Sequence, residues 1–190
     1  MKQPFRADME VIRRRAREKM DEGAVTAAYQ ADREQVIEVL NQVLATEIVC
    51  VLRYKNHYFT APGVHGDSVK REFLEHAQEE QAHADMVADR IVQLGGNPDL
   101  NPQGLHTRAH AEYKESGDLE EMIREDLAAE RVAITTYSEI IRWLGDDDPT
   151  SRRMMEEILA KEEEHADDLA TLLEPTRRQR ATTSAGRAST

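Results

Sequence analysis

Glutamates and histidines recur at positions where amphipathic helices would bury them, and their side chains are possible metal ligands. The six residues are Glu47, Glu80, His83, Glu130, Glu162 and His165. Each lies among apolar residues spaced three and four apart, which is the period of an inward helix face. A carboxylate in a dry core is costly unless it is paired, protonated or bound to a metal. Four glutamates could balance two divalent cations, and each histidine could complete the coordination of one cation.

The arrangement of these residues carries more information than a single motif. Glu-x-x-His occurs from Glu80 and from Glu162, while Glu47 and Glu130 have no histidine three residues later. One glutamate from each of two helices, with Glu-x-x-His from two others, is the pattern of di-iron and di-manganese carboxylate bundles. A tyrosine follows each lone glutamate after seven positions, and these are Tyr54 and Tyr137. The alternative is a metal-free core of salt bridges and hydrogen-bonded histidines.

Four long helices must carry these residues, and local signals divide the chain into them. The predicted helices span about 32–59, 67–95, 118–145 and 148–174. We place N-caps at Asp32, Asp118 and Asp148, with Pro149 at a first helical position. A glycine pair at 95–96 ends the second helix, and Pro175 ends the fourth.

The lengths of the connections predict the topology. Short turns pair the first helix with the second and the third with the fourth, both antiparallel. The long stretch 97–117 lets the second and third helices run parallel, which gives an all-α four-helix bundle with one long crossover. We assign residues 1–30 to an N-terminal extension with a short helix over about 8–21, 31–174 to the bundle, and 175–190 to a disordered Arg/Ser/Thr tail.

Composition narrows the functional classes. The chain has 190 residues, a formal net charge of −12 and one cysteine, Cys50, so no internal disulfide is possible. We see no apolar run of about 18 residues, and therefore expect no membrane-spanning helix and a cytoplasmic protein. An acidic body repels nucleic acid on average, although both ends are rich in arginine. DNA binding by these ends is conceivable, but a solvated helix face and a flexible tail are favoured.

The bundle segment, roughly 31–173, resembles the bacterioferritins and the wider ferritin-like family. The resemblance includes the strings Leu44–Val49 and Met154–Leu159 together with the six acidic and histidine positions. It implies that Glu47 and Glu130 are terminal metal ligands, that Glu80 and Glu162 bridge two metals, and that His83 and His165 each bind one. It also implies that Tyr54 lies beside the centre and that Asp126 can orient a ligand histidine.

Three departures from a plain bacterioferritin matter. The family binds haem through a methionine directly after the glutamate of the second helix, and Gln81 stands there, so we expect no haem. The family's fifth helix is replaced by Pro175 and a polar tail. The N-terminal extension and the longer middle connection are similar to bacterioferritin-like relatives that form smaller, Dps-like shells, so a homo-oligomer of 12 or 24 chains is expected.

The resemblance implies iron oxidation coupled to iron storage, with two irons per chain and O2 or hydrogen peroxide as oxidant. Manganese is possible in the same ligand set, which leaves a manganese catalase or peroxidase as an alternative. A Dps-like shell that protects DNA is the alternative from a different class. A rubrerythrin is less favoured, because its usual rubredoxin domain needs four cysteines.

Several other residues carry weaker expectations. His76 lies one turn before Glu80 on the inward face, and a hydrogen-bonded core histidine is favoured over a proton relay or an iron guide. Glu79 competes with Glu80 as the ligand, and the helix period favours Glu80. We expect Cys50 in the core and Trp143 in packing or a subunit contact. Four histidines are expected to face solvent: His57, His65, His106 and His110.

Overall fold

The computed structural model describes residues 6–62 and 66–187, and within these ranges every element is helical and no strand forms. The elements are α1 (Met9–Arg15), the 3-10 turn η1 (Met20–Glu22), α2 (Arg33–Thr60), α3 (Gly66–Gln93), α4 (Leu105–Arg108), α5 (Leu119–Leu144) and α6 (Pro149–Arg187). The all-α prediction is confirmed, and the four long helices coincide with the four predicted ones except at the end of α6.

The starts of three long helices follow from aspartate caps, as predicted. Asp32, Asp118 and Asp148 each accept a hydrogen bond from the backbone N–H three residues later, over 3.2, 3.0 and 2.9 Å. Each carboxylate satisfies one of the N–H groups that the first helical turn leaves without a partner. At the other end of α5, Gly145 takes a φ of 50°, which a residue with a side chain rarely adopts.

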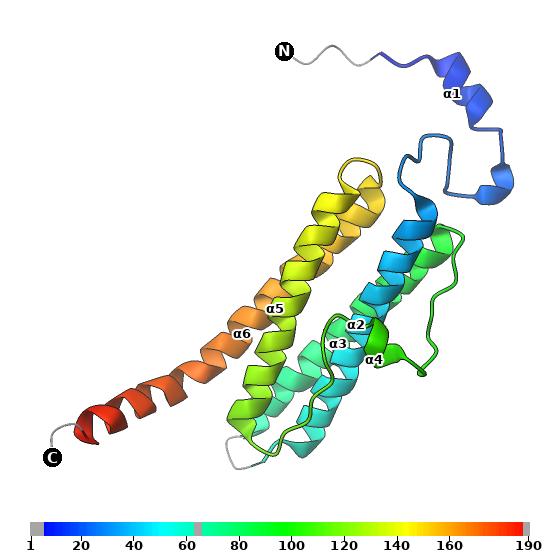
Figure 1. Cartoon of the computed structure of the whole chain (residues 1–190). Helices are drawn as coiled ribbons and strands as arrows, with labels where there is room; N and C mark the ends of the chain where they lie inside the picture. Colours follow the sequence, from blue (N-terminus) through cyan, green and yellow to red (C-terminus); the bar gives the residue numbers. More distant parts are fainter. Residues whose placement is uncertain (1–5, 63–65, 188–190) are drawn as a thin grey trace.

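The four long helices form a bundle with one long crossover (Figure 1). Helices α2 and α3 run antiparallel, as do α5 and α6. The connection between α3 and α5 returns along the length of the bundle and contains the single turn α4. Helices α3 and α5 therefore run in the same direction, which confirms the predicted topology.

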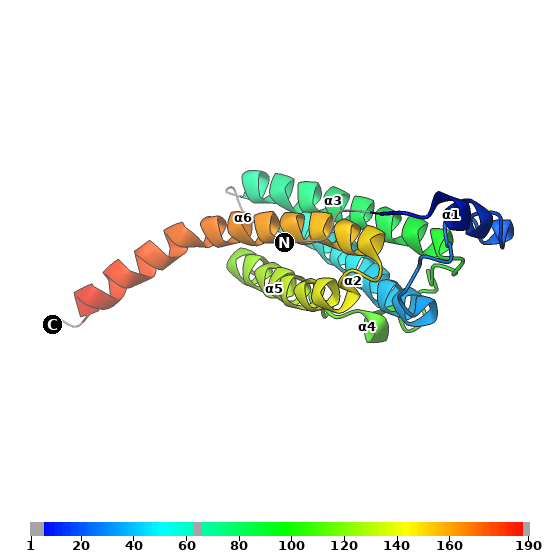
Figure 2. The same ribbon diagram turned by 90° about the horizontal axis from the view of Figure 1, so that it is seen from above.

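Helix α6 does not end before Pro175 as predicted. Its backbone remains helical to Arg187, and its last turns extend away from the other helices (Figures 1 and 2). A proline inside a helix removes one hydrogen bond and bends the axis, but it does not always terminate the helix. The residues after Pro175 include arginine, glutamine and alanine, which favour helix. The predicted helix end is thus wrong, and residues 175–187 form helix where a disordered tail was expected; the division into domains stays a prediction.

The N-terminal extension is less regular than a single helix over 8–21. It contains α1 and η1, and it lies beyond one end of the bundle (Figure 1). Tyr29 connects the extension to the bundle by donating a hydrogen bond of 3.0 Å to Asp148 Oδ2. The same carboxylate receives Arg90 from α3, at 2.9 Å, and therefore joins three segments.

Two apolar clusters fill the bundle on either side of a polar layer. One is built around Leu40, Val87 and Ile158, and the other around Phe73, Met122 and Leu169. The sequence predicted this order, because every inward helix face is apolar at its ends and carries glutamate or histidine in its middle. Each long helix therefore contributes polar residues to the same level of the core.

Helix α2 is long and apolar enough to cross a membrane by length and composition, which the sequence analysis did not expect. More than half of its most apolar window, 56%, is buried among the other helices, and the helix carries the buried acid Glu47. The apolar character of α2 is accounted for by its place in the core of the bundle.

Candidate metal centre

The structure brings all six predicted ligands together in the polar layer between the two apolar clusters. None is more than 5% exposed. Helix α2 supplies Glu47 and α5 supplies Glu130, while α3 supplies Glu80 and His83 and α6 supplies Glu162 and His165. Glu80 and His83 on α3, like Glu162 and His165 on α6, are three residues apart and therefore lie on one face of their helix.

The six side chains form two overlapping groups, each able to hold one metal ion. The first group is Glu47, Glu80, His83 and Glu162, and the second is Glu80, Glu130, Glu162 and His165. Within each group, one ligand atom from every residue lies within 4.8 Å of the others. Glu80 and Glu162 belong to both groups, which is the geometry that two bridging carboxylates require. Each group takes three residues from one antiparallel helix pair and one from the other pair.

Each of the six residues has one buried polar atom without a hydrogen-bond partner among the described residues. These atoms are Glu47 Oε2, Glu80 Oε1, His83 Nδ1, Glu130 Oε2, Glu162 Oε1 and His165 Nδ1. Buried polar atoms in folded proteins are nearly always satisfied, so a cluster of exceptions requires an explanation. Carboxylate oxygens and imidazole nitrogens are ligands that iron and manganese accept, and the donor set therefore fits a pair of such ions.

Charges across the centre shift the protonation of both predicted ligand histidines. His83 Nδ1 lies 3.1 Å from Glu162 and 3.3 Å from Glu47. Burial alone would lower the pKa of His83, but the carboxylates of Glu162, Glu47 and Glu80 outweigh it and raise the pKa to about 12. Burial likewise opposes a raised pKa at His165, and the surrounding carboxylates, Glu162 foremost, raise it to about 9. Protons on these rings thus offset part of the acidic charge when no metal is bound.

The buried glutamates of the centre differ in the direction of their pKa shifts. Burial, followed by the charge of Glu162, raises the pKa of Glu80 and of Glu130 well above the usual value. Burial opposes a low pKa at Glu162, but the imidazoles of His165 and His83 lower it nonetheless. In the metal-free centre these shifts favour protons on both carboxyl and imidazole groups, with which a bound metal would compete.

The two tyrosines connect the halves of the centre in a way that the sequence did not show. Tyr54, on the same helix as Glu47, donates its hydroxyl hydrogen to Glu130 on α5. Tyr137, on the same helix as Glu130, donates to Glu47 on α2. Burial and the charge of these carboxylates raise the pKa of both tyrosines, so they remain hydrogen-bond donors. The predicted place of Tyr54 beside the centre agrees with the structure, and its catalytic role stays a prediction.

Glu79 belongs to neither of these two metal-capable groups and instead contacts the predicted ligand His165. Its carboxylate lies 2.7 Å from His165 Nε2 and 3.3 Å from Lys161 Nζ. A histidine that donates one ring N–H to a carboxylate presents its other nitrogen to a metal. Glu80 and not Glu79 lies in the metal-capable groups, while the role of Glu80 as a ligand stays a prediction. The helix period could not show the contact between Glu79 on α3 and His165 on α6.

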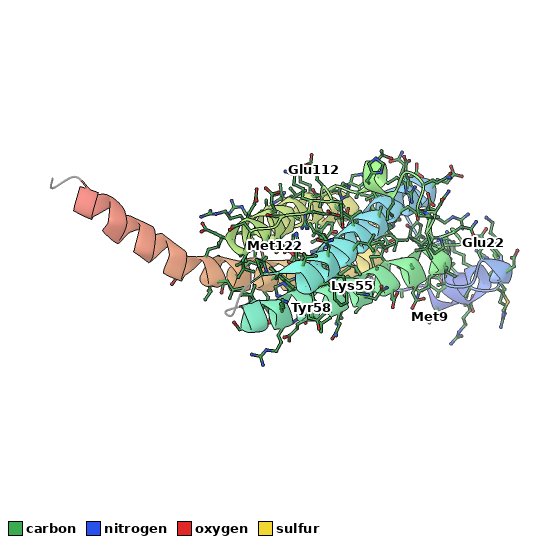
Figure 3. All side chains as sticks on the ribbon, turned by 90° about the horizontal axis from the view of Figure 1, so that it is seen from below. Met9, Glu22, Lys55, Tyr58, Glu112 and Met122 are labelled. Carbon is green, nitrogen blue, oxygen red and sulfur yellow. The ribbon has the colours of Figure 1, made fainter. Side chains whose placement is uncertain are left out.

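Asp126 does not contact a ligand histidine, contrary to the expectation. Its two oxygens lie 2.8 Å from Arg53 Nε and 2.8 Å from His57 Nδ1. Arg53 also donates a 2.8 Å hydrogen bond to the backbone oxygen of Glu112, whose side chain lies at the outer edge of the bundle (Figure 3). Asp126 therefore belongs to a buried ion cluster that fixes the crossover connection to α2.

The remaining histidines follow the expectations only in part. His57 is fully buried, so the prediction that it faces solvent is wrong, and Asp126 is the partner that retains it in the core. His110 is half-buried with Nδ1 3.2 Å from the Thr46 hydroxyl, whereas His106 is exposed as predicted. His65 lies outside the described residues. Cys50 is a buried core residue as predicted, and Trp143 is 47% exposed.

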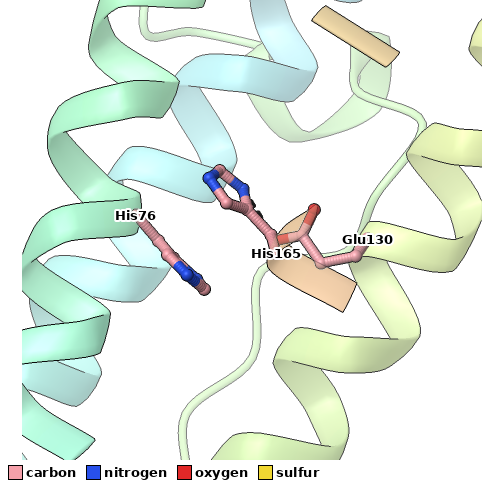
Figure 4. Close-up of side chains that lie close together, drawn as sticks. All are labelled: His76, Glu130 and His165. Atoms are coloured by element: carbon pink, nitrogen blue, oxygen red, sulfur yellow. Dashed lines mark ion pairs between the residues drawn. The ribbon is translucent and has the colours of Figure 1, made fainter. Parts of the chain in front are cut away.

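His76 is buried and hydrogen-bonded, and it also lies within reach of Glu130 and His165 as a possible metal ligand, so its role stays a prediction. Its Nδ1 lies 3.2 Å from the Tyr54 oxygen, and its ring stacks on that of His165 with centroids 4.0 Å apart (Figure 4). Burial, together with the nearby His165 charge, lowers the pKa of His76 to about 3, so the ring is neutral. Gln81, which replaces the haem methionine, is exposed and donates to Asp85 over 3.0 Å. The expected absence of haem stays a prediction.

A four-helix bundle with one long crossover and a carboxylate-histidine core defines the ferritin-like class of bundles. Comparison with known proteins agrees, because residues 37–179 match the family model of the ferritin-like domain. The chain belongs to this family.

Relatives within the family include a nutrient stress-induced DNA-binding protein of Synechococcus, which is 31% identical over 59% of this chain and 66% of its own length. A bacterioferritin of Desulfovibrio desulfuricans is 26% identical over 61% of this chain and 62% of its own length. The chain thus spans about two thirds of the length of these curated relatives.

Solved structures show the same fold. A dodecameric thioferritin, the bacterioferritin-related protein of Bacteroides fragilis, is 32% identical with a TM-score of 0.76, and the match covers 80% of this chain and 92% of that one. An archaeal Dps homologue from Halobacterium salinarum is 26% identical with a TM-score of 0.70, over 76% and 82% of the two chains.

Proposed function

We propose that this protein oxidises Fe(II) at the centre described above and stores the iron inside a homo-oligomeric shell. The single observation that carries the proposal is the set of six buried ligand atoms without hydrogen-bond partners, arranged as two overlapping groups. Ion-pair contacts of 3.1 to 3.4 Å join five of these atoms to one another, but none of the six completes a hydrogen bond with a described residue, and buried polar atoms left in that state are destabilising. Two bound metal ions would give each of the six atoms a partner.

The reaction uses two Fe(II) ions as substrate. Together they give two electrons to one O2, which takes up two protons and becomes hydrogen peroxide; hydrogen peroxide as oxidant would take two electrons and two protons and become water. Four carboxylates supply four negative charges, which balance two divalent ions and favour the harder ferric product. Glu80 and Glu162 would contact both ions, while Tyr54 and Tyr137 hold the terminal carboxylates in place. The protons displaced from the ligands are available to the reduced oxidant.

An oligomeric shell would provide the space for the oxidised product. The relative of known structure with 32% identity is described as dodecameric, which supports a shell of 12 chains over one of 24. Sedimentation or light scattering of the full chain measures the number of subunits. A stable monomer would contradict storage in a shell while leaving the oxidation centre untouched.

The decisive experiment is stopped-flow oxidation of Fe(II) by the purified, metal-free protein. Glu47→Gln combined with Glu130→Gln should abolish the fast phase that consumes about two Fe(II) per chain. Glu38→Gln, an exposed charge change on the same helix as Glu47, is the matched control and should leave that phase intact. Equal oxidation rates in wild type and the double variant would refute the centre. Oxygen release from peroxide, without iron oxidation and with manganese bound, would identify a catalase instead.

DNA protection is a second candidate, supported by two observations. The relatives include proteins named for DNA binding and for DNA protection during starvation, and the last turn of α1 exposes Arg13, Arg14 and Arg15. In a shell these arginines would be repeated on every chain and could bind phosphates, with affinity that falls steeply as salt increases. A gel shift that disappears in Arg13→Gln/Arg14→Gln/Arg15→Gln would support this function, and binding that is unchanged by this variant would contradict it.

A further inference from the structure

A further group of potential ligands lies beside the six-residue centre, between α3 and α6, and its histidine is also close to Glu130 and His165 of that centre. It consists of Glu72 and His76 from α3 and Asp168 from α6, and one ligand atom from each lies within 4.8 Å of the others. His76 Nε2 is 3.5 Å from Glu72 Oε1 and 3.9 Å from Asp168 Oδ2. The histidine is only 2% exposed, while the side chains of Glu72 and Asp168 are 31% and 46% exposed. The group therefore opens toward solvent on one side and ends at a buried ring on the other.

The hydrogen bonds of the centre determine which nitrogen of His76 faces this group as an acceptor. Tyr54 has one hydroxyl hydrogen, and it donates that hydrogen to Glu130. The Tyr54 oxygen can then only accept from His76 Nδ1, which lies 3.2 Å away. A neutral imidazole that donates from Nδ1 carries its lone pair on Nε2. That lone pair points toward the carboxylates of Glu72 and Asp168.

Three electron-pair donors that face one another repel unless a cation lies between them. Lys161, which lies nearby on α6, is already held by Glu79 at 3.3 Å and by Glu164 at 2.8 Å. A metal ion would satisfy the nitrogen and balance the two carboxylates at once.

We propose that Glu72, His76 and Asp168 bind one divalent transition-metal ion on the outer side of the two-metal centre. One imidazole and two carboxylates suit Fe(II), Co(II), Mn(II) or Zn(II), whereas calcium and magnesium take oxygen ligands almost exclusively. In the working protein the ion is Fe(II), an assignment that rests on the proposed function; the site itself does not depend on it. The ring of His76 stacks on His165 of the centre (Figure 4), so an ion here waits next to the position that it would enter.

The test is the number of Co(II) ions bound by the full-length, metal-free protein under nitrogen, measured by equilibrium dialysis and metal analysis. Wild type should bind about three per chain, two in the centre and one outside it. Glu72→Gln combined with Asp168→Asn should bind one fewer. The matched control is Glu75→Gln with Asp167→Asn, which removes the same charge from exposed positions on the same two helices and should retain all three. Both pairs of positions are at least partly exposed, so the fold should persist.

A second variant separates this site from the proposed function. Glu47→Ala with Glu130→Ala should lose the ions of the centre and retain the one held by Glu72, His76 and Asp168. Wild type that binds only the two ions of the centre, with no change in Glu72→Gln/Asp168→Asn, would overturn the further site and leave the oxidation centre intact. Binding of a single ion that is lost in Glu72→Gln/Asp168→Asn would support the further site and contradict the two-metal centre. An equal loss in the control pair would show binding to surface charge alone and overturn the site.

Discussion

Replacing Asp126 with alanine should lower the free energy of unfolding of the metal-free protein by about 3–5 kcal/mol, because it leaves a buried charge without its partner. Arg53 is 2% exposed and Asp126 is fully buried, and Arg53 Nε lies 2.8 Å from the carboxylate. The same contact on the surface would contribute about 0–1 kcal/mol, so burial decides the expected size. His57 would lose a hydrogen-bond partner as well, since Asp126 lies 2.8 Å from its Nδ1.

The assay is urea denaturation at a fixed chain concentration, followed by circular dichroism. Arg53→Met combined with Asp126→Leu is the informative comparison, because it removes both charges and fills the same volume with apolar groups. This double variant should be more stable than Asp126→Ala, although it lacks the bond from Arg53 to the Glu112 carbonyl. A loss under about 1 kcal/mol in Asp126→Ala would refute the reasoning, because exposed pairs show losses of that size. Metal stoichiometry should be unchanged, since Asp126 contacts no predicted ligand.

Three further predictions concern protons and the tyrosines. The pKa of Asp148 lies below its usual value of 3.8, because hydrogen bonds from Ser151 and Tyr29 and the charge of Arg90 outweigh the effect of burial. The contribution of Asp148 to stability should therefore be complete above about pH 4 and be lost as the pH falls through the folded-state pKa. The stabilities of wild type and Asp148→Asn should converge at low pH, as measured by acid unfolding. Anaerobic loading with Zn(II) at neutral pH should release protons, because metal displaces those held by the ligands; a pH-stat titration without proton release would contradict this. Tyr137→Phe should slow iron oxidation without changing the number of ions bound, and reduced binding would show that the hydroxyl matters for affinity as well as for orientation.

The helices and the level of the centre could be predicted because their signals are local. Asp32, Asp118 and Asp148 act within one turn of their own position, so a cap is visible in a few residues of sequence. Glutamate and histidine in otherwise apolar faces are visible in the same way, since the helix period alone shows which side is inward. Six such residues on four helices then imply a common layer.

The contacts across the bundle could not be predicted, because periodicity does not show which residue lies opposite another. His57 was assigned to solvent because it lies near the end of α2, yet Asp126, 69 positions later, is at the same height on α5. The helix end predicted at Pro175 was wrong for a different reason. A proline is a strong signal for a helix end, but it does not always terminate a helix, and α6 continues past Pro175 to Arg187.

Tyr54 and Tyr137 each bond a glutamate of the other helix pair, and this affects how the centre forms. Each antiparallel helix pair carries three of the six predicted ligands, and each of the two metal-capable groups includes one glutamate from the other pair. Tyr54 and Tyr137 add the same dependence for the terminal ligands, because each holds the glutamate of the opposite pair. Neither pair can therefore assemble a complete metal position, and the buried charge of one pair is balanced only when the other is docked. Metal binding and docking of the two helix pairs are thus thermodynamically coupled, so that metal should stabilise the interface between the pairs more than the helices within either pair.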